Sequence, residues 1–163
     1  MIAVFGPMRL CILSNQVRLP VGMAIQGLSH LTFIVRDVDR TAVFLCQGLG
    51  AREVYDSSNE NFSLSREKFF VLGGVWLVAM EGDPPEQQTY QHVAFKVEES
   101  DLPFYEARLH ALGLEIHPPR NRIDGEGRSL YFYDFDNHLF ELHTGMLEPR
   151  LERYAVGPPS TPS

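Results

Sequence analysis

Two histidines, His30 and His92, begin two similar apolar segments and together could bind a metal ion. The first segment reads Ser-His-Leu-Thr-Phe-Ile-Val over 29–35, and the second reads Gln-His-Val-Ala-Phe-Lys-Val over 91–97. Alternate residues are apolar in both, which is typical of a half-buried strand whose successive side chains point to opposite faces. Each histidine therefore lies on the face opposite the apolar set. Histidines at equivalent positions of two repeats can meet at one metal ion if the repeats pack as symmetric halves.

A carboxylate inside a further apolar strand could complete such a site. Glu141 lies in the segment His-Leu-Phe-Glu-Leu-His over 138–143, where a carboxylate is costly unless it is paired or binds a metal. Two neutral histidines and one carboxylate form a triad that suits Mn²⁺, Fe²⁺ or Zn²⁺ and leaves positions open for a substrate. A solvent-facing role for Glu141 is the alternative. We rank His143 below Glu141 as a ligand and expect it to support the site or to have a structural role. We expect His110 and His117 to be surface or packing residues.

Composition limits the classes of partner. The chain has 163 residues, a net charge of −7 and two cysteines. The length fits one domain, or two small halves that share a core. The negative charge and the lack of a basic patch argue against nucleic acid and anionic membrane surfaces as partners. Two cysteines provide neither a disulfide framework nor a zinc-binding pair, so we expect a cytoplasmic location. No apolar run approaches the ~18 residues of a membrane-spanning helix.

The two histidine segments begin two copies of a βαβββ unit. Each is followed by a stretch with helical features that ends at a glycine, over 37–50 in the first copy and 102–113 in the second. The pattern predicts an α+β domain made of two modules that are linked by residues 82–86. Short strands are expected over 52–56, 62–65 with 69–72, and 75–81 in the first copy, and over 114–117, 130–133 and 138–143 in the second.

The ends of the chain differ in composition from the repeats. We expect residues 1–22 to be a poorly ordered extension before a natural start at Met23, with a weak signal sequence as the alternative. The Pro- and Ser-rich residues 155–163 are expected to form a disordered tail. The remaining residues, 23–154, are expected to form a single domain, with repeat one over 23–82, repeat two over 88–146 and a C-terminal helix over 147–154.

Four stretches resemble the fosfomycin resistance proteins of the vicinal oxygen chelate superfamily, which includes glyoxalases, bleomycin resistance proteins and dioxygenases. These stretches are Ser-Leu-Ser-Arg-Glu-Lys-Phe-Phe over 63–70, Met-Glu-Gly-Asp over 80–83, Gln-Thr-Tyr-Gln-His over 88–92, and the whole of 125–143. The sequence is most similar to the FosX type, the manganese-dependent fosfomycin epoxide hydrolases. The resemblance implies an eight-stranded, incompletely closed, cup-shaped barrel. It also implies a homodimer in which each metal site draws on both chains.

The resemblance assigns roles to four residues. His30, His92 and Glu141 match the metal ligands, with Mn²⁺ as the expected ion and other divalent ions as alternatives. Glu67 matches the general base that activates water in the hydration of the fosfomycin epoxide to a vicinal diol. Related thiol transferases hold no base at this position. Without the resemblance, Glu67 would be interpreted as an exposed hairpin charge.

The phosphonate of fosfomycin requires cationic and hydroxyl partners. Arg150 matches the family arginine that holds the phosphonate, a role that suits its planar set of donors. The arginines around position 128 could replace the monovalent cation that the thiol transferases bind nearby, which puts a potassium requirement in doubt. Each candidate could instead be a packing or surface residue. The candidate substrate contacts are Thr32, Tyr90, Arg122, Arg128, Ser129, Tyr131 and Arg150.

Other functions stay open at this point. A fosfomycin thiol transferase, which uses glutathione or another thiol, would have the same fold and metal site. A non-enzymatic drug-binding protein of this superfamily typically lacks the metal triad, so the three candidate ligands count against that class. Glyoxalase or dioxygenase activity is a more distant alternative. The expected partners are therefore a small-molecule substrate and a second copy of the chain, with no nucleic acid and no membrane.

Overall fold

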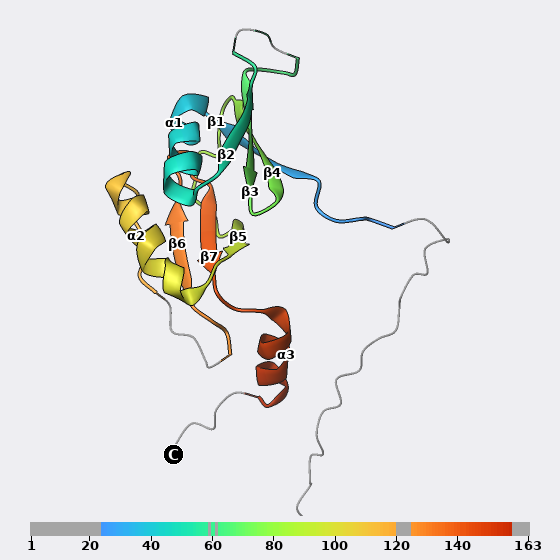
Figure 1. Cartoon of the computed structure of the whole chain (residues 1–163), viewed down its shortest axis with the longest axis vertical. Helices are drawn as coiled ribbons and strands as arrows, with labels where there is room; N and C mark the ends of the chain where they lie inside the picture. The colour runs from blue at the N-terminus through green and yellow to red at the C-terminus, as the bar shows by residue number, and fades with distance from the viewer. Residues whose placement is uncertain (1–23, 59, 61, 120–124, 158–163) are drawn as a thin grey trace, which may run out of the picture.

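The computed structural model describes residues 24–58, 60, 62–119 and 125–157, which form two sheets with helices on either side (Figure 1). The expected extension over 1–22, Arg122 and the tail residues 158–163 lie outside the described residues. No helix in the described part is long and apolar enough to cross a membrane.

The first half forms a four-stranded sheet in the order β1-β4-β3-β2, in which β1 is parallel to β4. Asp37 begins the first helix because its side chain accepts hydrogen bonds from the backbone N–H groups of Asp39 and Arg40, both at 2.9 Å. The elements are β1 (His30–Val35), α1 (Val38–Val43), the π-helical η1 (Phe44–Gly48), β2 (Arg52–Asp56), β3 (Glu67–Leu72) and β4 (Val75–Glu81).

The second half repeats this plan with a three-stranded sheet in the order β5-β7-β6, in which β5 is parallel to β7. Its first helix ends at Gly113, whose φ of 76° lies in the left-handed region that glycine adopts without strain. The elements are β5 (His92–Lys96), the short η2 (Glu99–Asp101), α2 (Leu102–Ala111), β6 (Ser129–Tyr133), β7 (Leu139–His143) and α3 (Leu147–Ala155).

Two expected strands are wrong. Residues 62–65 lie in the loop between β2 and β3, where Phe62 and Leu64 are exposed, because backbone pairing across this hairpin stops at Ser57 and Glu67. Residues 114–117 contribute one isolated bridge, from Ile116 to Phe132, rather than a strand. The α+β class is confirmed, and the described residues contain seven strands.

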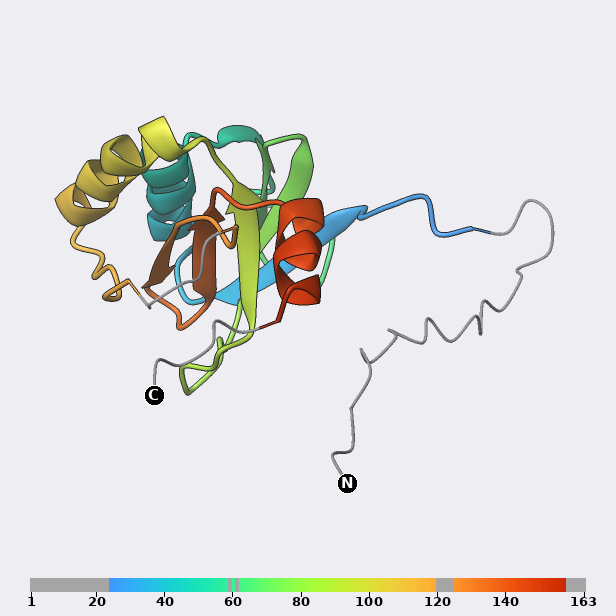
Figure 2. The same ribbon diagram turned by 90° about the horizontal axis from the view of Figure 1, so that it is seen from below.

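One hydrophobic core joins the halves. The apolar faces of both sheets meet where the rings of Phe33 and Phe140 lie 5.2 Å apart, and Phe44 of η1 packs against Phe140. Figure 2 shows α1 and α2 together on one side of the strands and α3 on the other side. The faces of the sheets that point away from α1 and α2 are therefore the ones available for a site.

Candidate metal and substrate site

Strand register gathers polar residues on one face of the second sheet. Glu141 on β7 lies between Ala94 on β5 and Tyr131 on β6. His143, two residues after Glu141 on β7, pairs with Ser129, two residues before Tyr131 on the antiparallel β6. Because side chains alternate along a strand, these residues share the face opposite the core. The expectation that Glu141 and His143 lie on the same face is confirmed.

His92 and Glu141 form the centre of this face. The Nδ1 atom of His92 lies 2.8 Å from the carbonyl oxygen of Tyr90. A carbonyl only accepts, so Nδ1 carries the proton and Nε2 is an acceptor. That Nε2 lies 3.1 Å from Oε2 of Glu141, which is also an acceptor when the carboxylate is ionised. A metal ion or a proton between the two atoms would relieve the repulsion of their lone pairs. A backbone carbonyl behind the histidine is the usual support of a metal ligand, so this pair fits a divalent metal ion.

The Glu141 carboxyl group is held in its ionised form. It is only 5% exposed, and burial alone would raise its pKa. Hydrogen bonds from the hydroxyl groups of Ser129 and Tyr131 outweigh burial and lower the pKa of Glu141 below its usual value. A deprotonated carboxylate is the form that binds a metal ion.

Two tyrosines stand beside the pair. The rings of Tyr90 and Tyr131 lie 5.2 Å and 5.6 Å from the ring of His92 and 6.2 Å from each other. Burial raises the pKa of Tyr131 well above its usual value, and its hydrogen bonds with Glu141 and Tyr90 add to that shift. The Tyr131 hydroxyl group therefore stays protonated and can donate.

Arg150 and His143 extend the cluster toward α3. Nη2 of Arg150 lies 3.1 Å from Nε2 of His143 and 3.1 Å from the carbonyl oxygen of Glu126. On its other side, Nδ1 of His143 lies 2.8 Å from Oγ of Ser129. The helix thus brings a guanidinium group to the polar face of the second sheet.

The first sheet carries a second set of candidates on one face. Register pairs His30 with Trp76, Thr32 with Val78, and Glu67 with Met80. His30 is exposed, its ring lies 4.6 Å from the ring of Trp76, and its Nδ1 is 3.3 Å from Oγ of Ser29. This half therefore provides one imidazole, one hydroxyl group and one carboxylate.

Glu67 is buried, with 7% of its surface exposed, so its interpretation as an exposed hairpin charge is wrong. Its backbone N–H donates to Oγ of buried Ser57 at 3.0 Å, and its carbonyl accepts from the N–H of Ser57 at 3.0 Å. In the described residues, its carboxylate makes no hydrogen bond or ion pair. Glu67 is therefore a buried carboxyl residue on the candidate face of the first sheet, and its backbone is held across the hairpin by Ser57.

The two cations beside Glu67 point to the opposite face and are neutralised there. Lys68 Nζ lies 3.1 Å from Asp39, 3.2 Å from Glu53 and 3.0 Å from Asp56. Arg66 contacts Asp39 at 2.8 Å and Asp56 at 3.3 Å. Burial disfavours the charge of Lys68, but its carboxylate partners outweigh burial and raise its pKa.

Comparison with known proteins identifies the family. The model of the glyoxalase/bleomycin resistance protein/dioxygenase superfamily matches residues 27–142. The fosfomycin resistance protein FosX of Listeria monocytogenes is 54% identical to this chain over 130 residues, which are 80% of the chain and 98% of FosX. The chain belongs to the FosX family within this superfamily.

Solved structures and a more distant relative extend this result. A mutant of FosX from Listeria monocytogenes, complexed with Mn(II) and 1S,2S-dihydroxypropylphosphonic acid, has a TM-score of 0.73 and 50% identity to this chain, and the match covers 80% of this chain and 99% of that one. The metallothiol transferase FosB of Bacillus licheniformis is 37% identical over 136 residues, covering 80% of this chain and 82% of FosB.

The structure of this FosX-family chain brings together only part of the expected set. One face of the second sheet carries four of the expected residues, and Arg150 approaches that face from α3. The four are His92, Ser129, Tyr131 and Glu141. No group of three or more His, Cys, Asp or Glu residues that could hold a metal ion is found in the described ranges. His30 lies on β1 of the first sheet, whereas His92 and Glu141 lie on β5 and β7 of the second sheet. The guanidinium group of Arg128 contacts Glu99 at 3.3 Å on η2.

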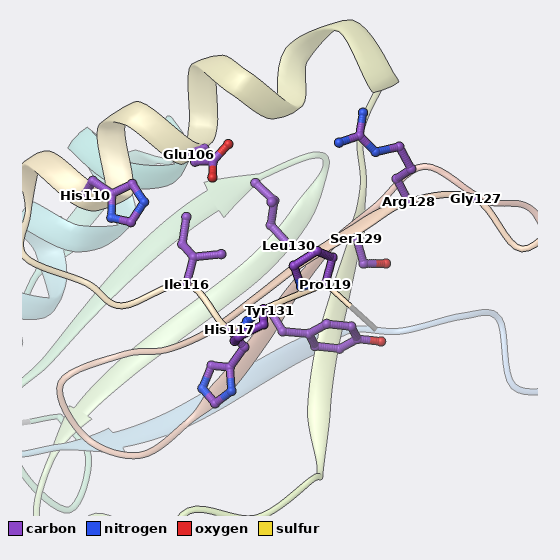
Figure 3. Close-up of a pocket in the computed structure, with 11 residues that line it drawn as sticks. Glu106, His110, Ile116, His117, Pro119, Gly127, Arg128, Ser129, Leu130 and Tyr131 are labelled. Carbon is purple, nitrogen blue, oxygen red and sulfur yellow. The ribbon is translucent and has the colours of Figure 1, made fainter. Parts of the chain in front are cut away.

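A cavity of about 450 Å³ lies between α2 and β6 beside this face. Figure 3 shows the side chains of Ser129 and Tyr131 pointing the same way from β6, while Leu130 points toward α2. The expectation that His143 supports the site or has a structural role stays a prediction, whereas the support that Ser57 gives to Glu67 was not predicted. A histidine two residues after a candidate ligand was the available signal for His143, and the sequence held no signal for Ser57.

Proposed function

We propose that this protein hydrates the epoxide of fosfomycin to a vicinal diol in a Mn²⁺-dependent reaction and thereby confers resistance to the antibiotic. The observation that carries the proposal is the facing pair of His92 Nε2 and Glu141 Oε2, two acceptors 3.1 Å apart in a FosX-family fold. The scarcity of cysteines favours a reducing compartment, so we place the reaction in the cytoplasm.

The relatives support both the metal and the product. Solved FosX structures contain Mn(II), and one also contains 1S,2S-dihydroxypropylphosphonic acid, a phosphonate with two neighbouring hydroxyl groups. Addition of water to the epoxide of fosfomycin gives a diol of this kind. Oxygen and nitrogen donors such as Glu141 Oε2 and His92 Nε2 suit Mn²⁺.

We propose that the third ligand is His30 of the partner subunit in a homodimer. His30 belongs to the same repeat position as His92, but it lies on the first sheet while the His92–Glu141 pair lies on the second, and no group of three candidate ligands is found in the described residues of one chain. It is exposed on the face of β1 that points away from the core. A second copy related by a twofold axis would bring His30 of one chain to Glu141 of the other and create two such sites.

Exposed apolar side chains support this dimer. Leu147, Leu151 and Tyr154 on α3 are 63%, 56% and 50% exposed, and no residue of α3 is buried. Ile25 and Leu28, just before β1, are 92% and 63% exposed. Apolar surface of this extent on a helix and on the segment that precedes a ligand strand is typical of a surface that a partner covers.

We propose that Glu67 is the general base. It accepts a proton from a water molecule while the oxygen of that water attacks an epoxide carbon, the carbon–oxygen bond of the ring breaks, and the ring oxygen takes up a proton to give the diol. Burial of Glu67 and its two backbone hydrogen bonds with Ser57 support this role. General-base catalysis typically contributes about 10²- to 10⁴-fold to a rate.

Further residues of the chain bind and orient the substrate. When bound, Mn²⁺ supplies Lewis-acid stabilisation of the negative charge that develops on the epoxide oxygen. We assign the phosphonate to Arg150, with the hydroxyl groups of Thr32, Tyr90, Ser129 and Tyr131 as further contacts. Arg150 provides the planar donors that suit a phosphonate. In the described residues its hydrogen bonds use only Nη2, which leaves its other nitrogens for a ligand.

Phosphorus NMR tests this function against thiol transfer. Fosfomycin is incubated with the enzyme and Mn²⁺ in ¹⁸O-labelled water, with and without glutathione. We expect a diol that carries one ¹⁸O atom to form in the absence of thiol, and removal of the metal by chelation to stop the reaction. A product that appears only with glutathione would show that the protein is a thiol transferase.

A further inference from the structure

A chain of hydrogen bonds joins Arg150 on α3 to Glu141 on β7, and His143 is its central member. Nη2 of Arg150 lies 3.1 Å from Nε2 of His143, and Nδ1 of His143 lies 2.8 Å from Oγ of Ser129. Ser129 Oγ in turn donates to Oε1 of Glu141. The two ends of this chain are the residue assigned to the phosphonate and a residue assigned to the metal.

The direction of every bond in this chain is determined by its first member. A guanidinium group only donates hydrogen bonds, so Nε2 of His143 must be an acceptor and carries no proton. The proton of the imidazole is then on Nδ1, from which it is donated to Ser129 Oγ. Because this oxygen accepts from His143, its own proton is free to point at Oε1 of Glu141. Nδ1 of His143 also lies 3.3 Å from the same Oε1, which agrees with a protonated Nδ1.

These hydrogen bonds determine the orientation of the Glu141 carboxylate. The two donors, Ser129 Oγ and His143 Nδ1, lie at Oε1 of Glu141, while Oε2 faces Nε2 of His92 at 3.1 Å. The Oε1 atom is therefore held by His143 and Ser129, while Oε2 is directed at the other candidate ligand, His92. Outer partners of this type fix the orientation of metal ligands.

The backbone around His143 is built to accommodate the ring. A Cβ atom on Gly145 would lie 2.5 Å from Nε2 of His143 and 2.5 Å from the carbonyl oxygen of Glu126. A larger residue at position 145 would therefore displace the imidazole from Arg150. The same carbonyl of Glu126 accepts a hydrogen bond from Nη2 of Arg150, so the loop before β6 helps to place the guanidinium group.

We propose that His143 is a positioning residue which, with its proton on Nδ1, couples the arginine that holds the phosphonate to the carboxylate that holds the metal. The proposal rests on the proposed function for the roles of Arg150 and Glu141. It assigns to His143 neither a metal bond nor a step in proton transfer. Its role is to orient two residues that act directly, so its loss should weaken both substrate and metal binding.

The variants His143→Phe and His143→Gln separate this role from simple packing. Phenylalanine keeps a ring without polar atoms, whereas glutamine keeps one donor and one acceptor. For His143→Phe we expect the dissociation constant of Mn²⁺ to rise by roughly 10- to 100-fold, together with a rise of about tenfold in KM for fosfomycin. His143→Gln should recover most of both losses. If His143→Phe matches the unmutated protein, or if glutamine recovers nothing, the proposal is overturned.

A double-mutant cycle tests the coupling to Arg150. In an Arg150→Ala background, His143→Phe should change KM much less than it does in the unmutated protein, because the contact is already absent. Arg153→Ala is the matched control, since Arg153 lies on the same helix and donates to the carbonyl of Gly157 instead. The full effect of His143→Phe should persist there. Equal effects in the Arg150 and Arg153 backgrounds would contradict the proposed coupling.

The tautomer can be read without any activity. The full-length protein, labelled with ¹⁵N-histidine and loaded with diamagnetic Zn²⁺, is examined by two-bond ¹H–¹⁵N NMR, and the signals of His143 are assigned by their loss in His143→Gln. We expect a protonated Nδ1 and an unprotonated Nε2. A proton on Nε2, alone or together with Nδ1, would refute the proposal. The proposed function would fail separately, by the absence of diol from the unmutated enzyme.

Discussion

The two halves of the chain share one strand plan but carry different chemistry at equivalent positions. His30 in the first half and His92 in the second begin equivalent strands, and each faces an apolar residue on the parallel neighbour. Two residues further along, the first half has Val78 where the second has Glu141. The second half therefore provides two candidate ligands and the first half provides one.

The two halves also differ on the next strands, β3 and β6. Glu67 on β3 is the equivalent of Ser129 on β6, since they pair with Met80 and His143 at corresponding positions. Ser129 stabilises the carboxylate of its own half, whereas Glu67 has no such neighbour and keeps its own carboxylate available. In the proposed site, the second half thus supplies two of the metal ligands, and the first half supplies the third ligand and the base. Neither is a complete site alone.

Loss of a ligand should have the largest effect. We expect His92→Ala and His30→Ala each to weaken Mn²⁺ binding by more than the roughly 10- to 100-fold that loss of a supporting residue costs, and to abolish diol formation. Isothermal titration with Mn²⁺ measures this, with His110→Ala on the exposed side of α2 as the control that keeps its affinity. Retention of full Mn²⁺ affinity in His30→Ala would remove the first half from the metal site.

Loss of the proposed base should lower the reaction rate and leave the affinity for Mn²⁺ unchanged. Glu67→Gln keeps size and shape but cannot take a proton, so we expect kcat to fall by about 10²-fold or more while Mn²⁺ still binds. Glu81→Gln, an exposed residue at the end of β4, is the matched control. Near-normal diol formation by Glu67→Gln would mean that the first half supplies no base.

Disruption of the apolar side of α3 should weaken the association of the two chains in the proposed dimer. Leu151 is 56% exposed, and a charge there would face the apolar surface of the partner in the proposed dimer. We expect Leu151→Glu to raise the dimer dissociation constant at least about tenfold, as measured by sedimentation velocity. Glu152→Gln should leave association unchanged. A stable dimer in Leu151→Glu would exclude this side of α3 from the interface.

The smallest effect concerns the charged cluster behind Glu67. The backbone N–H of Ser58, with help from Lys68 and Arg66, lowers the pKa of Asp56 to about 2. A pKa that is lower in the folded state means that the ionised carboxylate stabilises the fold above the usual Asp range, and that this contribution is lost as the pH falls toward 2. Asp56→Asn should therefore lower Tm by a few degrees at neutral pH, and the difference should vanish near pH 2. The exposed Asp83→Asn should show no such pH dependence.

The sequence predicted the strands and the faces better than the contacts between elements. Alternation along 29–35 and 91–97 is a local property, so the positions of His30 and His92 opposite the core could be predicted. The burial of Glu67 could not, because Glu67 begins β3 opposite Ser57, whereas the pattern placed it between two short strands over 62–65 and 69–72. The partners of His143 depend on the return of α3 toward β7, which periodicity does not record.

Mixing of two inactive variants tests most directly whether each site combines the first half of one chain with the second half of another. His30→Ala and His92→Ala proteins are unfolded together and refolded with Mn²⁺, and diol formation is compared with that of each variant alone. In a mixed dimer one site contains both substitutions and the other contains neither. The account predicts recovery of about a quarter of the unmutated activity, because random pairing makes half of the dimers mixed and repairs one of their two sites. A mixture as inactive as its two parents would contradict it.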